Sequence, residues 1–224
     1  MGSNPTLSAT FRQRHHGMLG DDATTARLPL KTTSILWRRL DQPGHEFARL
    51  APCDGGWLLS GAAVLAEAGE PCRLDYRIRC DAQWRTLEVG IEGVVGTREV
   101  ALRVTVDEAQ RWFVDGVECA ALAGCQDVDL GFSPSTNLLP IRRLALAVGE
   151  QASVRAAWLR FPQLVFEPLE QVYRRVEARR YGYESGGGSF RAELDVDDEG
   201  FVVRYPDFWE RFAAGTGRGR RRRG

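Results

Sequence analysis

Apolar and polar residues alternate strictly in several short segments of the chain. In RLDYRIRC (73–80) every second residue is apolar, and the same period recurs in segments 87–92, 100–106 and 190–196. Successive side chains of a strand point to opposite faces of a sheet, so this period gives each strand one apolar and one wet face. Such alternation is typical of antiparallel sheet. The sequence therefore predicts a mainly β fold.

Shorter stretches of similar composition and their turns extend this prediction. Asp115-Gly116, directly after Trp-Phe-Val, indicates a tight hairpin turn. Residues 138–142 are compatible with a short helical turn, and residues 164–183 with either a long strand or a helix. Further strands are expected near 56–66, 111–115, 144–148, 153–161 and 201–205.

Two segments share a shape. In VTVDEAQRWFVDG (104–116) and LDVDDEGFVVRYP (194–206), a strand ends in Val-Asp, a polar turn follows, and an aromatic residue opens the return strand. This similarity suggests two related β-layers joined through residues 127–143. A sheet of this length must bury one face, and little helical pattern exists to cover it. We expect one large antiparallel sheet curled into an open or half barrel, with an apolar concavity and little helix.

Composition predicts where the folded part of the chain begins and ends and in which compartment the protein lies. We expect a disordered tail over residues 1–32, a single β-rich domain over 33–214, and a disordered Arg/Gly-rich tail over 215–224. Acidic and basic residues number 30 each, which argues against a general polyanion binder. The arginine-rich tail is the main nucleic-acid signal, but no basic patch with interleaved aromatic residues accompanies it, so no specific nucleic-acid binding is expected. No apolar run reaches the length of a membrane span, and the N-terminus lacks the apolar core of a secretory signal. A cytoplasmic protein is the expectation.

Residue types that usually carry catalysis are scarce. Two of the three histidines, His15 and His16, lie in the predicted tail, and His45 stands in a turn-like segment, so a Ser-His-Asp arrangement is not expected. No nucleotide-binding or metalloprotease motif is present. The sequence predicts no catalytic residue, no cofactor and no metal. The five cysteines lack CxxC spacing and read as reduced thiols, with a Cys72–Cys80 or a Cys119–Cys125 bridge left open.

The segment DVDLGFSPSTNLLPIRR (127–143) is the least repetitive in the chain. Asp127 and Asp129 share one face of a predicted strand, where their nearness raises one pKa if neither has a partner. The favoured interpretation is that both carboxylates pair with Arg142 and Arg143, which the same segment supplies. The segment is then a crossover between two β-layers rather than an active site.

Several blocks of sequence resemble the bacterial family described as putative glycolipid-binding, over about residues 33–212. That resemblance implies a fold similar to the open β-barrels of bacterial lipoprotein-carrier proteins, which hold acyl chains in a concave cavity. It brings no established catalytic residues. The blocks that carry it are ILWRRLD (35–41), DVDLGFSPSTNLLPIRRLALAVG (127–149), AAWLRFPQLVFEPLEQVYRR (156–175), YGYES (181–185) and FRAELDVDDEGFVVRYPDFWERF (190–212).

The leading hypothesis is a non-enzymatic binding protein whose concave sheet holds an apolar or amphipathic ligand, namely a lipid or glycolipid. Tryptophans would form the apolar wall, and an amide and two arginines would meet a polar head group. One alternative is a hydrolase of sugars or lipids acting through Asp127, Asp129 or Glu170. Another is an interaction scaffold that uses a sheet edge or the arginine tail; the oligomeric state is left open. The predicted ligand-binding residues are Trp84, Trp112, Asp129, Asn137, Arg142, Arg143, Trp158 and Tyr181.

Overall fold

The computed structural model describes residues 31–217, and these form one continuous sheet of fifteen strands. Its strand order is β8-β7-β6-β5-β4-β3-β2-β1-β15-β14-β13-β12-β11-β10-β9. Neighbours are antiparallel except β9 and β10, which run parallel. The strands are β1 (Thr32–Arg39), β2 (Gly44–Cys53), β3 (Gly56–Glu67), β4 (Glu70–Asp81), β5 (Thr86–Val95), β6 (Arg98–Val106), β7 (Trp112–Val114), β8 (Val117–Glu118), β9 (Asp127–Leu130), β10 (Gln151–Arg160), β11 (Val165–Glu177), β12 (Arg180–Ser185), β13 (Phe190–Val196), β14 (Val202–Tyr205) and β15 (Trp209–Gly217).

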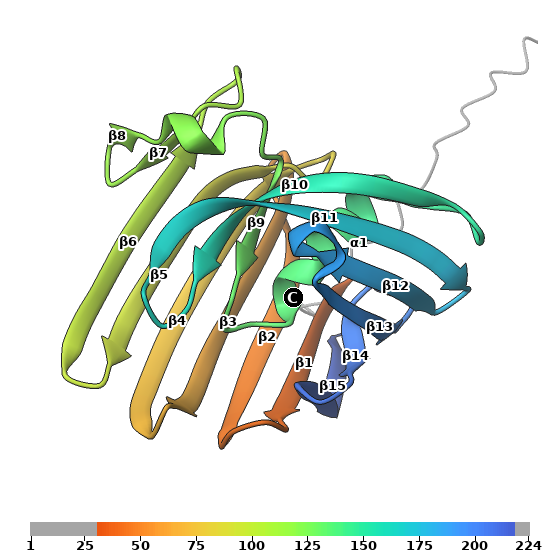
Figure 1. Ribbon diagram of the computed structural model, residues 1–224, viewed down its shortest axis with the longest axis horizontal. Helices are drawn as coiled ribbons and strands as arrows, with labels where there is room; N and C mark the ends of the chain where they lie inside the picture. The colour runs from red at the N-terminus through yellow and green to blue at the C-terminus, as the bar shows by residue number, and fades with distance from the viewer. Residues whose placement is uncertain (1–30, 218–224) are drawn as a thin grey trace, which may run out of the picture.

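The sheet is open but strongly curled (Figure 1). Strands β1 to β8 form one run of neighbours and β9 to β15 another, and the two runs meet where β1 pairs with β15. Edge strand β9 also reaches the start of β5. The Thr86 N–H donates to the Gln126 carbonyl at 3.0 Å, and the Val128 N–H donates to Thr86 Oγ1 at 3.0 Å. The predicted mainly β fold, a large antiparallel sheet curled into an open barrel, is confirmed.

Helical structure in the described residues is confined to short pieces. The single α-helix, α1, spans Leu138–Leu144 and directly follows a 3-10 turn, η2, over Ser135–Asn137. Two further 3-10 turns are η1 (Ala120–Leu122) and η3 (Gly186–Gly188). Leu138 and Leu139 are fully buried in the same core as the inward faces of β1 to β6. Helix α1 therefore fills part of the concavity (Figure 1).

We call residues 131–145, which contain η2 and α1, the crossover segment. It connects β9 to the loop before β10 and lies inside the curled sheet. The sequence predicted that it joins two β-layers. The structure corrects this, because a single sheet forms both walls and the segment packs between them.

One predicted strand is wrong. Residues 144–148 are not a strand, since α1 continues to Leu144 and ends at Ala145, whose φ of 45° is left-handed. The expected partner, β10, has β9 on one edge and β11 on the other, so neither edge is vacant for a further strand. The helical turn at 138–142 is confirmed, and residues 164–183 are the extended strand β11 with the start of β12.

The shape shared by segments 104–116 and 194–206 has a local explanation. In each, an aspartate directly after the first strand accepts the backbone N–H four residues later and so closes the turn. The turn between β4 and β5 has the same geometry, although it lies in neither segment. A turn used three times accounts for the similarity without duplication; the pairs are Asp81 with Arg85, Asp107 with Arg111, and Asp197 with Phe201, each at 2.9 Å.

The ends of the described region refine the predicted boundaries. Strand β15 continues to Gly217 because it stays paired with the beginning of β1, so the predicted domain end at residue 214 falls inside a strand. Residues 1–30 and the arginines of 218–224 lie outside the described residues. All five cysteines are free thiols, and Cys72 and Cys80 lie at opposite ends of β4. No helix within residues 31–217 is long and apolar enough to cross a membrane.

Candidate ligand-binding site

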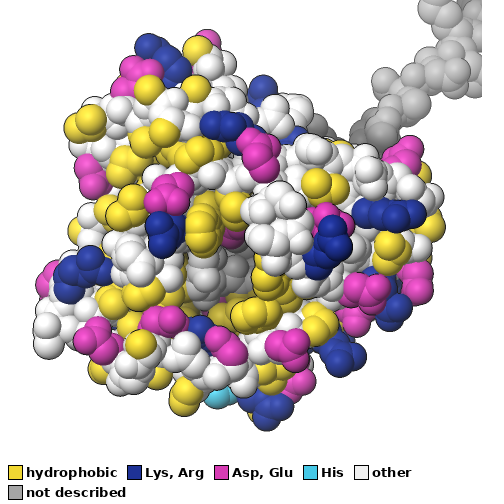
Figure 2. Space-filling model, viewed as in Figure 1, with side chains coloured by type: hydrophobic (Ala, Val, Ile, Leu, Met, Phe, Trp, Pro, Cys, Tyr) yellow, Lys and Arg dark blue, Asp and Glu magenta, His cyan; other side chains and the backbone are white. Residues whose placement is uncertain are grey.

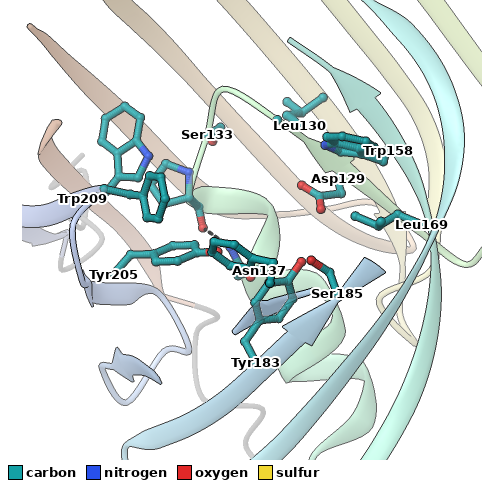
Figure 3. A pocket seen from close by; sticks show the side chains of 14 residues that line it. Asp129, Leu130, Ser133, Asn137, Trp158, Leu169, Tyr183, Ser185, Tyr205 and Trp209 are labelled. Carbon is teal, nitrogen blue, oxygen red and sulfur yellow. Dashed lines mark hydrogen bonds between the residues drawn. The ribbon is translucent and has the colours of Figure 1, made fainter. Parts of the chain in front are cut away.

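A cavity of about 290 Å³ opens beside the first half of the crossover segment. The view in Figure 2 shows a molecule hollowed near its centre, with hydrophobic side chains gathered around the hollow. We call the cavity of about 290 Å³ the aromatic cavity, because aromatic side chains make up much of its wall (Figure 3). Its lining residues are Asp129, Leu130, Gly131, Ser133, Pro134, Asn137, Trp158, Leu169, Tyr183, Ser185, Phe190, Tyr205, Phe208 and Trp209.

Asp129 is the acid of the aromatic cavity. Gln171 on β11 donates its Nε2–H to Asp129 Oδ2 at 2.6 Å, and the Thr136 hydroxyl lies 3.4 Å from Oδ1. Burial raises the pKa of Asp129 to about 6, while these hydrogen bonds oppose the rise. A carboxylate has about four lone-pair positions. Acceptor positions therefore remain for a ligand after Gln171 and Thr136 are counted.

Asn137 is held in a fixed orientation at the centre of the same wall (Figure 3). The buried Tyr173 hydroxyl donates to Asn137 Oδ1 at 2.8 Å, and Asn137 Nδ2 donates to the Pro134 carbonyl at 3.2 Å. An amide side chain carries two donors and two acceptor positions. One of each is still available to a ligand, on a side chain that loses little freedom when it binds.

The aromatic walls come from strands far apart in the sequence. Tyr183, Phe190, Tyr205 and Phe208 form a chain of edge-on and tilted contacts, with ring centroids 5.3–6.4 Å apart. Trp158 on β10 lies opposite (Figure 3), against the backbone of Gly131. A Cβ on Gly131 would stand 3.0 Å from Trp158 Nε1 and 2.8 Å from the Leu159 carbonyl, so the close approach of β9 and β10 requires glycine here.

Behind Ser133 lies a buried acid that the sequence analysis missed. The Ser133 and Tyr76 hydroxyls each lie 2.6 Å from Glu46 Oε1, and Ser135 Oγ lies 2.7 Å from the hydroxyls of both. Glu46 Oε2 is buried without a partner among the described residues. Burial raises the pKa of Glu46 to about 8.

A signal for this acid was present in the sequence. Glu46 is in phase with Ala48 and Leu50, whose side chains are buried, so an acid stands on the apolar face of β2. The sequence analysis placed His45 in a turn-like segment and predicted no strand over residues 44–53, so the acid on this apolar face was missed. Gly61 gives a second signal, since it directly faces Tyr76 across β3 and β4 and leaves room for the tyrosine ring.

A second cavity, of about 320 Å³, lies beside the second half of the crossover segment. We call it the arginine cavity, because three guanidinium groups line it. The Arg142 guanidinium lies over the Trp84 ring at 4.9 Å, and that of Arg175 over the Tyr181 ring at 5.8 Å. Its lining residues are Trp84, Ile141, Arg142, Ala145, Arg175, Ala178, Arg179, Tyr181, Val196, Asp197, Asp198 and Gly200.

Six of the eight predicted ligand-binding residues line one of the two cavities. Asp129, Asn137 and Trp158 line the aromatic cavity, and Trp84, Arg142 and Tyr181 line the arginine cavity. The remaining two, Trp112 and Arg143, line neither.

Those two residues have structural partners that explain their positions. Trp112 is 1% exposed and donates its indole N–H to the Cys125 carbonyl at 3.0 Å, so it is core rather than cavity wall. Arg143 donates to both oxygens of Asp127, a carboxylate with a 1% exposed side chain. The predicted Asp–Arg pairing therefore holds for Asp127, whereas Asp129 pairs with Gln171 and Thr136.

The arrangement bears on the hydrolase hypothesis. Asp129 is the only acid among the residues lining the aromatic cavity, and Asp127 is engaged with Arg143. Glu170 pairs with Arg155 and its side chain is 64% exposed. A hydrolase mechanism in which two carboxylates flank the bond that is cleaved therefore lacks the second carboxylate in this cavity. Residues 31–217 also contain no group of three or more His, Cys, Asp or Glu side chains placed to hold a metal ion.

Comparisons with known proteins identify the family and the fold. A crystal structure of a DUF1089 family protein from Pseudomonas aeruginosa is 35% identical, with a TM-score of 0.67 over 75% of this chain and 92% of that chain. A β-barrel-like protein of DUF1849 from Brucella abortus is 10% identical, with a TM-score of 0.52 over 84% of this chain and 98% of that chain, and shows a shared fold. No curated protein matches. The family model described as "Putative glycolipid-binding" matches residues 34–211, and the chain belongs to that family.

Proposed function

We propose that this protein is a non-enzymatic binding protein for an amphipathic ligand, a glycolipid, and that the aromatic cavity receives the sugar. The observation that carries the proposal is the presence of two oriented polar side chains inside a wall of aromatic rings. Gln171 orients Asp129, and Tyr173 orients Asn137. Such a combination of apolar surface with a few fixed polar groups is the usual composition of a small-molecule site. The family's description supports the same ligand class.

The polar groups favour a sugar over an acyl chain as the occupant. An acyl chain placed against Asp129 would remove water from a carboxylate and offer it no hydrogen bond, which costs free energy. Sugar hydroxyls donate to a carboxylate and both donate to and accept from an amide, while the apolar faces of the ring pack on aromatic side chains. The sugar therefore satisfies both kinds of wall at once.

The size of the cavity supports the same assignment. Ligand pockets generally enclose roughly 300–1,000 Å³, and the aromatic cavity, at about 290 Å³, lies at the lower limit of that range. It is suited to a ring-sized group rather than to a whole glycolipid. In this proposal the sugar is enclosed, and the lipid chains extend out of the cavity.

Two measurements on the full-length protein test the proposal. Organic extraction of the purified protein followed by mass spectrometry is expected to release a glycolipid. Calorimetric titration with alkyl glycosides below their micellar concentrations, namely octyl glucoside, octyl galactoside and dodecyl maltoside, is expected to show tighter binding than titration with 1-octanol.

Variants then locate the site. Asn137→Ala and Asp129→Asn are each expected to weaken alkyl glycoside binding about tenfold, the effect of losing one hydrogen bond to a polar or charged group. Asp75→Asn, on the exposed face of β4, is the matched control and should leave binding unchanged. Equal binding of 1-octanol and the glycosides together with an extract free of glycolipid would overturn the proposal.

A further inference from the structure

The arginine cavity holds positive charge that its own acids do not neutralise. Arg179 is engaged with Asp198 through two hydrogen bonds of 2.9 and 2.7 Å. Asp197 accepts hydrogen bonds from the backbone N–H groups of Glu199 and Phe201 and so stabilises the turn between β13 and β14. Within residues 31–217, neither Arg142 nor Arg175 has a carboxylate within salt-bridge distance. Three guanidinium groups and two carboxylates therefore line the cavity, and two of the guanidinium groups form no ion pair within the described chain.

Both guanidinium groups are held in place by other contacts. Arg175 donates from Nη1 to the Leu146 carbonyl at 2.8 Å and from Nη2 to the Ala178 carbonyl at 2.6 Å, while Tyr181 lies beneath it. Arg142 lies over Trp84, whose ring is stacked on Trp57 with centroids 4.6 Å apart. Guanidinium groups fixed in this way lose little side-chain entropy when they bind a ligand.

We propose that the arginine cavity is an oxyanion-binding site for a phosphate group, separate from the sugar-binding aromatic cavity. A guanidinium carries five N–H donors, and Arg175 uses two of them in the bonds above, so donors remain on both arginines. A tetrahedral phosphate has several acceptor oxygens and can accept from two such groups at once. The proposal stands on the cavity's own charge and does not require the aromatic cavity to bind a sugar.

The two cavities lie at opposite ends of helix α1. Asn137, just before the helix, lines the aromatic cavity, and Arg142, near its end, lines the arginine cavity. The same phosphate chemistry is offered by a phosphorylated lipid head group and by a free phosphate compound. The experiment therefore includes one arm for each source.

In the first arm, inorganic phosphate is titrated into the full-length protein and binding is followed by calorimetry and by the rise in Tm. Arg142→Gln is expected to weaken binding about tenfold or more, because it removes charge-assisted hydrogen bonds. The phosphate affinity of Arg142→Lys should lie between those of the wild type and Arg142→Gln, because lysine keeps the charge but lacks the forked donors of a guanidinium. The matched control is Arg49→Gln, an exposed arginine of β2 with no ion pair among the described residues, and it should leave binding unchanged.

In the second arm, the protein is sedimented with phosphatidylcholine vesicles that contain or lack phosphatidic acid. A head-group ligand predicts sedimentation only with phosphatidic acid, lost in Arg142→Gln and competed by inorganic phosphate. A free phosphate ligand predicts binding in the first arm and none here. Absence of binding in both arms, or equal loss in Arg49→Gln and Arg142→Gln with circular dichroism showing all variants folded, would overturn the proposal.

Discussion

The two ends of the crossover segment are attached to the sheet by different chemistry. Its first end, around Ser133 and Ser135, hydrogen-bonds to Glu46, an acid with hydroxyl partners and no cation among the described residues. Its second end is attached through Arg143, which forms an ion pair with the buried Asp127. Both ends therefore rest on a buried carboxyl group, and only one of the two has its charge compensated.

This difference determines how each end responds to pH. Burial raises the pKa of both acids, but at Asp127 the Arg143 guanidinium opposes the rise, and at Glu46 only hydroxyl groups do. The first end is stable when its acid is protonated, whereas the second retains its attachment when its acid is ionised. The aromatic cavity adjoins the first end and the arginine cavity the second, so each cavity can be perturbed separately.

The largest expected effect comes from crowding the first end through Gly61. A Cβ at this position would overlap the Tyr76 hydroxyl and stand 2.6 Å from the Phe47 carbonyl. Gly61→Ala should displace Tyr76 from Glu46 and Ser135, lowering the free energy of unfolding by about 3–4 kcal/mol, the combined cost of overpacking and of lost buried hydrogen bonds. Urea unfolding measures this change.

Gly90→Ala is the control for Gly61→Ala. Gly90 also lies within a strand, β5, yet a Cβ there meets nothing within 4 Å. It should change the free energy of unfolding by less than about 0.5 kcal/mol. Similar losses in the two variants would show that the cost arises from glycine replacement in a strand and not from the Tyr76 cluster.

Breaking the ion pair tests the second end. Arg143→Gln leaves Asp127 buried without a cation, and removal of one partner of a buried pair costs about 3 kcal/mol. The pKa of Asp127, already raised by burial, should rise further, so the loss should be greatest at pH 8 and smaller at pH 5. Urea unfolding at both pH values measures it. An equal loss in the free energy of unfolding at pH 5 and pH 8 would show that Arg143 does not stabilise this end by compensating the charge of Asp127.

Much of the fold could be predicted because it follows from local pattern. Period-two alternation located β4, β5, β6 and β13, and similar composition located β3, β7, β10 and β14. The Asp115-Gly116 dipeptide located the turn between β7 and β8. Strands β1, β2 and β15 were not predicted. The failure at residues 144–148 has a different origin. Alternation in LALAV favours a strand locally, but a strand needs a vacant neighbour, and which edges of β10 are occupied is a property of the whole sheet.

The candidate site was less predictable than the fold, because its partners lie far apart in the chain. Asp129 meets Gln171 and Asn137 meets Tyr173 through strand β11, whose secondary structure the sequence left open. Asp127 and Arg143, sixteen residues apart, could be paired from sequence because one segment supplies both. The Glu46–Ser133 contact spans 87 residues, and no local pattern specifies it.

The last comparison, and the one most specific to the difference between the two ends, comes from Glu46→Gln, whose expected effect on stability is close to zero near pH 5. Because the pKa of Glu46 is raised from 4.5 to about 8 in the folded protein, its protonated form favours folding; that contribution is complete below pH 4.5 and is lost as the pH rises through about 8. The wild-type free energy of unfolding should therefore fall between pH 5 and pH 8 through this group, with a slope of up to about 1.4 kcal/mol per pH unit. Glu46→Gln keeps the acceptor for Ser133 and Tyr76 and cannot ionise, so it should match the wild type near pH 5 and exceed its stability at pH 8. Glu92→Gln, on the exposed face of β5, should show the same dependence of the free energy of unfolding on pH as the wild type. If Glu46→Gln shows that dependence as well, the proposed difference between the two ends of the crossover segment is wrong.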